Sequence, residues 1–287
     1  MLTETIPSPT SAANSWKAHL ELAFAARENR TALTLRRHTG PLVVQKPLYP
    51  EGANICHTVI LHPPAGIAGG DELTMDIEAG PGSHAVISTP SATKWYKSGG
   101  RTARQNVNLR VGSSACLEWL PQENIFFESA DARLSLTLEL ADGARAIGWD
   151  AVMLGRAAAG ETWASGKVLA ENTFFQDGKR IWLERGLIAA NDPVRHTRTG
   201  LDGMNIAATL WAVSPACTLA LTEELGDILP WSETIRAGAT CLPGNLLLVR
   251  IIGRDIEPVR NLLVSLWMRL RQPLTGVAAQ PLRLWAS

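Results

Sequence analysis

Hydrophobic and polar residues alternate with a period of two along most of this chain. The alternation is clearest in six segments, at residues 19–25, 31–37, 72–78, 106–111, 133–140 and 180–188. Because successive side chains of a strand point to opposite faces of its sheet, each segment predicts a β-strand with one buried face. Turns containing Gly or Asp-Gly separate the segments. The pattern predicts an all-β fold, a large antiparallel or mixed assembly whose topology stays open, since no tandem sequence repeat identifies a solenoid.

One segment near the C-terminus has helical periodicity instead, and it predicts a helix over residues 255–271. Asp255 suits the N-cap, Pro258 falls in the first turn, and Pro273 is expected to end the helix. Apolar residues at helical spacing form one stripe, at Ile256, Val259, Leu262, Leu263, Leu266 and Leu270. The stripe predicts that the helix packs on the sheet or docks a partner helix. A partner could also cover the apolar segment 277–287.

Composition adds a domain organisation and excludes some classes of partner. We expect a flexible tail over residues 1–15 and a single β domain over residues 16–287. The 27 basic residues balance the 27 acidic residues, so charge indicates neither nucleic acid nor an anionic membrane as partner. No apolar run reaches the roughly 18 residues of a membrane span, and the N-terminus lacks the features of a secretory signal. Four scattered cysteines are typical of reduced thiols in the cytoplasm.

The segment 61–77 concentrates prolines and glycines in one loop, which invites comparison with phosphate-binding loops. Such loops need either a Lys followed by Ser or Thr, or a helix that begins at once. Here the loop ends in Gly69, Gly70 and Asp71, and the next residues alternate as a strand. The loop is therefore interpreted as a tight connection between two strands.

Candidate catalytic or metal motifs are scarce. The sequence contains neither a nucleophile signature nor a His-Glu-x-x-His or paired-Cys zinc motif. Cys56 and His57 are adjacent, so on a strand they face opposite ways and cannot chelate one ion. Acids do cluster around Pro121, which should end one strand near Leu120 and let another begin near Asn124. These acids, Glu118, Glu123 and Glu128, either face solvent beside the turn or line a polar channel or interface.

Four segments resemble the urease accessory protein family called UreD, or UreH in some organisms. Residues 62–71 (HPPAGIAGGD) resemble the family loop HPPGGIAGGD and depart from it at Ala65. Residues 88–98 (STPSATKWYKS), 117–127 (LEWLPQENIFF) and 153–168 (MLGRAAAGETWASGKV) resemble three further family segments. The resemblance extends in order over roughly residues 15–280, and four matches make chance similarity implausible.

The resemblance implies a fold and a function. The implied fold is an unusual all-β architecture of β-helical character, a large β-helix-like or β-sandwich-like single domain with two helices near the C-terminus. The implied function is a non-catalytic scaffold that joins apo-urease to UreF and to UreG, the GTPase, and assists nickel delivery. It further implies a cytoplasmic location, no tightly bound cofactor, transient Ni²⁺ only, and a dimer of heterocomplexes through UreF. A structural partner of UreF that never handles nickel is the alternative.

An internal polar channel for nickel has been proposed for this family, and the resemblance carries candidate residues to it. The candidate metal-route residues are His62, Asp71, Glu118, Glu123 and Glu161, and the other motif residues are Lys94, Tyr96 and Arg156. Imidazole and carboxylate are suitable nickel ligands, and weak sites would allow the ion to leave. Structural alternatives stay open, because Asp71 could cap the Gly70 turn and Arg156 could pair with Glu161 or Asp150.

The departure at Ala65 has a condition attached to it. It is mild unless that position needs a positive φ, where a Cβ costs about 1 kcal/mol or more.

Overall fold

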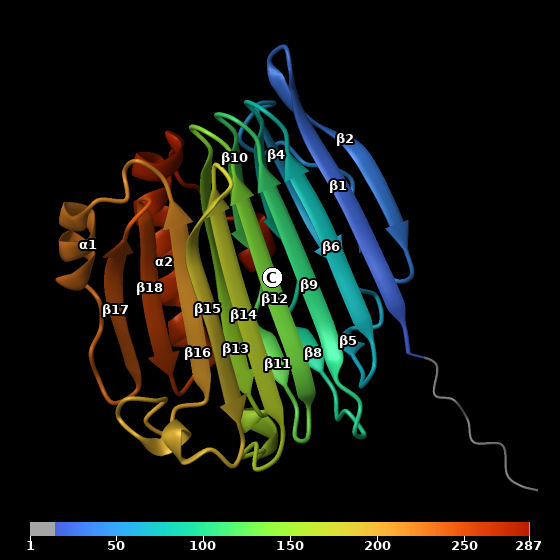
Figure 1. The fold of residues 1–287 in the computed structure, drawn as a ribbon, viewed down its shortest axis with the longest axis vertical. Helices are drawn as coiled ribbons and strands as arrows, with labels where there is room; N and C mark the ends of the chain where they lie inside the picture. The colour runs from blue at the N-terminus through green and yellow to red at the C-terminus, as the bar shows by residue number, and fades with distance from the viewer. Residues whose placement is uncertain (1–14, 287) are drawn as a thin grey trace, which may run out of the picture.

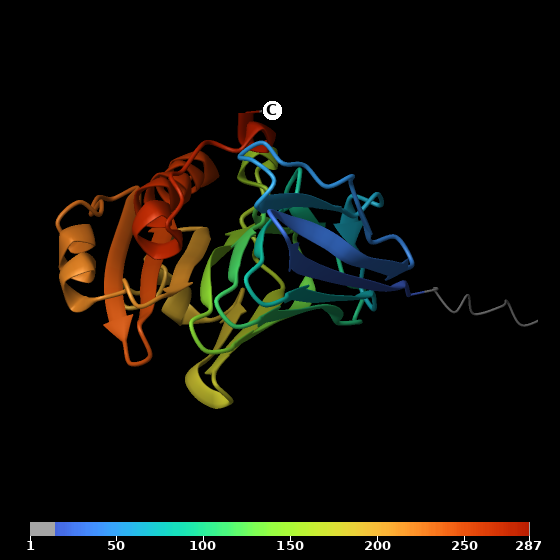
Figure 2. The same cartoon turned by 90° about the horizontal axis from the view of Figure 1, so that it is seen from above.

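A computed structural model describes residues 15–286, which form two layers of β-strands with helices at one side (Figures 1 and 2). The tail predicted over residues 1–15 lies outside the described residues, apart from Ser15. No helix among residues 15–286 is long and apolar enough to cross a bilayer. The strands are β1 (Lys17–Arg27), β2 (Arg30–Thr39), β3 (Val43–Val44), β4 (Ile55–Leu61), β5 (Gly66–Ile67), β6 (Glu72–Ala79), β7 (His84–Ser88), β8 (Thr93–Trp95), β9 (Ala103–Val111), β10 (Cys116–Leu120), β11 (Asn124–Phe126), β12 (Asp131–Leu140), β13 (Arg145–Leu154), β14 (Lys167–Gln176), β15 (Lys179–Ala189), β16 (Ile206–Val213), β17 (Ile235–Leu242) and β18 (Leu246–Gly253).

The middle of the chain winds as a β-solenoid. Its successive coils are β4–β5–β6, β7–β8–β9 and β10–β11–β12, followed by β13 and β14. The first strands of the coils stack in parallel register, so that Ile55, His84, Cys116 and Arg145 align. The last strands stack in a seven-stranded sheet of order β15-β14-β12-β9-β6-β1-β2. The prediction of a β-helix-like, all-β fold is therefore confirmed.

The same turn carries the chain from the seven-stranded sheet back to the larger sheet in successive coils. Its third residue has a positive φ in each case: Gly82 (67°), Ser114 (56°) and Gly143 (66°). The following amide N–H donates to the carbonyl three residues earlier, from Ser83, Ala115 and Ala144 to Gly80, Gly112 and Ala141. This hydrogen-bonded turn needs φ > 0 at its third position. The coils therefore repeat in backbone geometry without repeating in sequence.

The alternation predicted from the sequence places the core between the two sheets. In β6, for example, Leu73, Met75 and Ile77 are buried and face the opposite sheet. The predicted interruption around Pro121 is also confirmed, because β10 ends at Leu120 and β11 begins at Asn124.

The part of the chain that the structure describes contains two α-helices, α1 (Leu219–Gly226) beside β17 and α2 (Ile256–Thr275) on the outer face of the larger sheet. The apolar stripe of α2 forms a second core with that sheet, in which Val259, Leu263 and Leu270 are buried. Of the two predicted uses of this helix, packing on the sheet is the one observed.

The predicted end of this helix was wrong. The helix continues past Pro273 to Thr275, and Gly276 closes it with a φ of 81° and an N–H bond to the Gln272 carbonyl. Pro273 costs one backbone hydrogen bond in the last turn, while the buried Leu270 and Leu274 hold that turn against the sheet. Asp255 does occupy the N-cap, but its side chain accepts no capping hydrogen bond.

The apolar segment after α2 is partly covered by the chain itself. Trp285 packs against Trp149 and Trp267, with ring centroids 5.6 Å and 5.2 Å apart.

Candidate functional site

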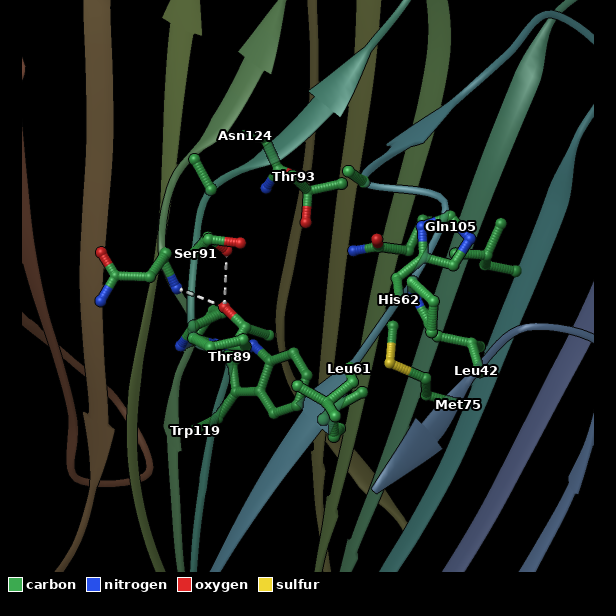
Figure 3. Close-up of a pocket in the computed structure, with 18 of the residues that line it drawn as sticks. Leu42, Leu61, His62, Met75, Thr89, Ser91, Thr93, Gln105, Trp119 and Asn124 are labelled. Atoms are coloured by element: carbon green, nitrogen blue, oxygen red, sulfur yellow. Dashed lines mark hydrogen bonds between the residues drawn. The ribbon is translucent and has the colours of Figure 1, made fainter. Parts of the chain in front are cut away.

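A cavity of about 420 Å³ lies between the two sheets of the solenoid (Figure 3). It occurs where the larger sheet is interrupted, because β7 ends at Ser88 and β10 ends at Leu120. Pro90 and Pro121 follow these ends, and proline cannot donate to a strand ladder. Side chains from the loops therefore line the space that strands would otherwise fill. Figure 3 shows His62, Gln105, Met75 and Leu42 on one side of the cavity and Thr89, Ser91 and Trp119 on the other.

Asp150 of β13 supplies a carboxyl group to this cavity. Its neighbour Trp149 packs into the core beneath α2, so the alternation of the strand turns Asp150 toward the inside of the solenoid. Burial raises the pKa of Asp150 to about 7. Asp150 is half-buried, since it lines the cavity. Near neutral pH this group can therefore bind or release a cation or a proton.

His62 supplies an imidazole to the same cavity. It follows the end of β4, and its Nδ1 is buried without a hydrogen-bond partner. Burial lowers the pKa of His62, although Asp71 acts in the opposite direction. The ring is therefore neutral at pH 7, which is the form that binds metals. Cys56, on the same strand, faces the core between the sheets, while His57 contacts Glu51, so these two face opposite ways as expected.

The remaining polar groups of the cavity are neutral. Thr89 Oγ1 accepts a hydrogen bond from the Gln122 amide at 2.9 Å and donates to the Ser91 carbonyl at 3.3 Å, as the dashed lines in Figure 3 mark. One imidazole, one carboxylate and several neutral oxygens are donors that a divalent ion such as Ni²⁺ accepts weakly. Among residues 15–286 no three or more His, Cys, Asp or Glu side chains come together as a metal site.

Glu118 lies on the other face of the larger sheet, beneath α2, and its side chain is fully buried. It accepts hydrogen bonds from Trp267 Nε1 at 2.7 Å and from Arg271 Nε at 3.0 Å, and it contacts His84 Nε2 at 2.7 Å. Burial opposes its charge, but His84 and Arg271 outweigh that effect and lower the pKa of Glu118. The solvent-facing interpretation of this acid was therefore wrong, because Glu118 is buried and paired.

Arg271 connects Glu118 to a second buried acid, Glu51. The Arg271 guanidinium is inaccessible to solvent and donates to both Glu51 oxygens and to the Ala278 carbonyl. Glu51 also contacts His57 at 2.7 Å. Burial opposes ionisation of Glu51, yet His57 and Arg271 lower its pKa to about 2. We call this group, Glu51, His57, His84, Glu118 and Arg271, the buried ion network.

Glu123 is likewise buried, with 6% of its side chain exposed, and it contacts Arg260 of α2 at 2.6 Å. Its solvent-facing interpretation was also wrong. Glu118 therefore ties α2 to β10, and Glu123 ties α2 to the bend between β10 and β11. Glu128, the third acid of the cluster, accepts hydrogen bonds from the amides of Ala164 and Ser165 at 3.0 and 2.6 Å.

Asp71 fastens the loop 62–71 to the start of β1. Its Oδ2 accepts from the Ala68 amide and its Oδ1 accepts from the Trp16 amide, both at 2.8 Å. The capping role that the sequence left open for Asp71 is thus observed.

The remaining candidate residues are not part of the cavity lining: Lys94, Tyr96, Arg156 and Glu161. Tyr96, Arg156 and Glu161 lie together near the short strands β8 and β11, which form the third side of the solenoid. Lys94 is exposed on β8. Tyr96 packs edge-on against Phe127 at 5.2 Å, and the Arg156 guanidinium lies over the same ring at 4.2 Å. Arg156 pairs with Glu161 and not with Asp150, and this hydrogen bond lowers the pKa of Glu161.

Ala65, at the cavity wall, has a φ of 61°. Ala65 replaces the glycine of the family loop, and because its φ is positive the Cβ of Ala65 is costly, as expected from the sequence for this case. The adjacent Gly66 leaves no room for a side chain, since a Cβ there would lie 2.3 Å from the Tyr96 ring.

Sequence reasoning named Asp150 only as a possible partner of Arg156 and missed its place in the cavity. It missed Glu51 and Arg271 altogether. Asp150 had a signal, since it is the single acid in the otherwise apolar run of β13. Arg271 had one too, because it falls four residues after Trp267 on the buried face of α2. Glu51 had none, as its partner is 220 residues away.

Comparison with known proteins gives a consistent result. The family described as UreD urease accessory protein matches residues 17–286. A urease accessory protein UreD of Cupriavidus necator is 52% identical over 285 residues, covering 98% of each chain. UreD proteins of Polynucleobacter asymbioticus and Bordetella pertussis are 50% identical over 273 residues and 43% identical over 279 residues, covering 95% and 96% of this chain and 94% and 98% of theirs. The family match over residues 17–286 and the identity to these relatives over nearly the whole chain show that this chain belongs to the UreD family of urease accessory proteins.

Proposed function

We propose that this protein is a non-catalytic scaffold of urease maturation, which joins apo-urease to UreF and UreG and lets nickel pass through the cavity between its sheets. GTP hydrolysis belongs to UreG in this proposal. The complex works in the cytoplasm and dimerises through UreF. Membership of the UreD family supports the role in urease maturation.

The observation that carries the nickel role is one cavity whose lining holds both an imidazole with an unpartnered nitrogen, His62, and a carboxyl group, Asp150. His62 Nδ1 has no hydrogen-bond partner, and the Asp150 carboxyl group is kept partly protonated near pH 7. A buried polar group without a partner is costly unless something binds it. One imidazole and one carboxylate bind a divalent ion weakly enough to release it onward, as a transit site requires.

The other candidate acids support a structural role for themselves. Glu118, Glu123 and Glu161 each have a basic partner within hydrogen-bond reach, so their oxygens are already used. Nickel would have to displace an arginine from each of them. We therefore assign the transit step to His62 and Asp150, and we assign Glu118 and Glu123 to holding α2 on the sheet.

The test is urease activation in cells that lack their own UreD protein. Asp150→Asn and His62→Phe should lower activation about tenfold or more, the usual cost of losing a metal-site group. Both variants should still co-purify with UreF and apo-urease. Asp142→Asn is the matched control, because Asp142 is an exposed acid in the turn before the same strand. Full activation by both cavity variants would refute the transit role.

The alternative, a structural partner of UreF that never handles nickel, is favoured by one observation. All the acids in the motif around Pro121 make protein contacts. If Glu118→Gln loses UreF binding while the cavity variants stay fully active, this alternative is correct.

A further inference from the structure

Within residues 15–286, no helix covers the outer face of the seven-stranded sheet. Figure 1 looks onto this face, with α2 behind the other sheet and α1 beside β17. Its central strands β6, β9, β12 and β14 are parallel, and parallel strands are usually covered on both faces. An uncovered parallel sheet therefore needs either polar side chains along its whole width or a partner.

Polar side chains account for the middle of this face. Asn108 donates to Asp76 at 2.8 Å, and Ser135 donates to Asn106 at 2.8 Å, from strands in register. These side chains therefore satisfy one another's hydrogen-bonding groups across neighbouring strands. They leave no charge that calls for a binding partner.

One end of the face differs, at the starts of β9, β12 and β14 and the end of β15. A shallow hollow of about 550 Å³ is lined there by four basic residues, Arg104, Arg133, Lys167 and Arg185, which we call the basic end. Two acids lie among them, Asp131 and Glu171, and beyond Arg104 in register follow Glu72 of β6 and Lys17 of β1. With these neighbours counted, five positive charges meet three negative charges and the excess is two. In a chain with a formal charge of zero, this excess is local.

The pairing within the basic end is weak. Glu171 lies 3.8 Å from Arg133 and 3.7 Å from Arg185, and Lys167 lies 3.3 Å from Asp131, all with exposed basic side chains. Exposed ion pairs of this kind contribute little to the stability of the fold. Within residues 15–286, Arg104 makes no ion pair. The four basic groups are therefore available to an incoming partner.

Two apolar side chains adjoin these charges. Leu169 and Leu187 face each other across β14 and β15 and line the same hollow, and Leu187 is 57% exposed. An exposed leucine beside uncompensated basic groups fits a protein surface that carries both carboxylates and an apolar side chain. A polyphosphate backbone would be repelled by the carboxylates of Asp131 and Glu171, and it would make no favourable contact with the leucines.

We propose that the basic end docks an acidic surface of a partner protein in the maturation complex. This inference rests on the proposed function for the identity of the complex. The partner contact contributes two or three carboxylates around an apolar side chain. Arginine suits this role because its planar group pairs with carboxylates in a bidentate way.

The opposite end of the same face provides matched controls. The hollow there is lined by Glu78, Glu139 and Asp177 with one basic residue, Arg110, so its charge is reversed. Lys179 and Arg180 are exposed beside it.

The experiment is assembly of the purified chain with UreF, UreG and apo-urease, each mixed separately and together, followed by gel filtration at two salt concentrations. Arg104→Glu with Arg133→Glu should weaken binding of one component about tenfold or more and reduce its salt dependence. Arg110→Glu with Arg180→Glu should not. Zero-length carbodiimide coupling of the wild-type complex should join Lys167, and not Lys179, to an acid of that component.

Three results would overturn the inference. Equal binding by both charge-reversed variants would remove the basic end from the interface while leaving the proposed function intact. Self-association of the isolated chain, abolished by Arg104→Glu with Arg133→Glu, would assign the face to a second copy. Failure of the wild-type chain to bind any of the three proteins would refute the proposed function together with this surface.

Discussion

Replacing Arg271 with methionine should severely destabilise the protein. The Arg271 side chain is fully buried and makes contacts with three segments, through Glu51, Glu118 and the Ala278 carbonyl. Methionine fills similar volume but leaves two buried carboxylates without their arginine. Breaking a buried pair by removing one partner costs about 3–5 kcal/mol. At about 2–4 °C per kcal/mol for a large domain, the melting temperature should fall by roughly 10 °C.

The control for this variant is on the same helix. Arg269 pairs with Glu224 at 3.8 Å, and the two side chains are 49% and 65% exposed. Arg269→Met should cost no more than about 0.5 kcal/mol, as exposed pairs do. Equilibrium urea unfolding measures both variants. A loss below about 1 kcal/mol for Arg271→Met, or equal losses for the two variants, would refute the assignment of the buried ion network as the fastening of α2.

Partial rescue separates charge from packing. Adding Glu51→Gln and Glu118→Gln to Arg271→Met removes the uncompensated charges while keeping the side-chain shapes. This triple variant should recover roughly half of the lost stability, because the penalty of unpaired buried charge exceeds the net value of the pairs. No recovery would mean that packing, and not charge, explains the loss.

Three further predictions concern single groups. Asp150→Asn should stabilise the protein by about 2 kcal/mol more at about pH 8 than at about pH 5. The reason is that the carboxyl group of Asp150 keeps its proton up to about pH 7 in the folded protein and releases it near pH 3.8 in the unfolded protein. Equal gains in urea unfolding at the two pH values would contradict this. Burial opposes the charge of His84, but Cys116 and Glu118 raise its pKa to about 10. The contribution of His84 to the free energy of unfolding is therefore complete below pH 6.5 and is lost as the pH rises toward 10. His84→Gln should flatten the fall in stability over that window. Ala65→Gly should raise the free energy of unfolding by about 1 kcal/mol, since Ala65 has a φ of 61°; a loss of stability would show that the Cβ makes a compensating contact.

The strands were the most predictable part of the fold, because one face of each is buried. Segments 72–78 and 133–140 fall within β6 and β12, and both alternate as expected. The coil was predictable only through the family resemblance and not from the alternation, since the repeated turn has Gly82, Ser114 and Gly143 at equivalent positions and only its φ angles and its hydrogen bond recur. A repeat carried by backbone conformation leaves no sequence identity to detect.

The site was only partly predictable, for a different reason. His62 was identified through its motif, and it does line the cavity. Glu118 was also identified, but its partners Trp267 and Arg271 come from a helix about 150 residues later in the chain. Whether an acid faces a cavity or a basic side chain is decided by tertiary packing, which no local pattern encodes.

The most direct test of the proposed nickel passage is to fill the cavity and count nickel in urease. Met75→Trp with Thr93→Trp would place two large rings in the cavity, since both side chains line it. Thr137→Trp, on the outer face of β12, is the control. Nickel per urease active site, measured after activation with complexes that still contain UreF and apo-urease, should fall to background for the filled cavity and stay normal for the control. Normal nickel content with a filled cavity would contradict the account.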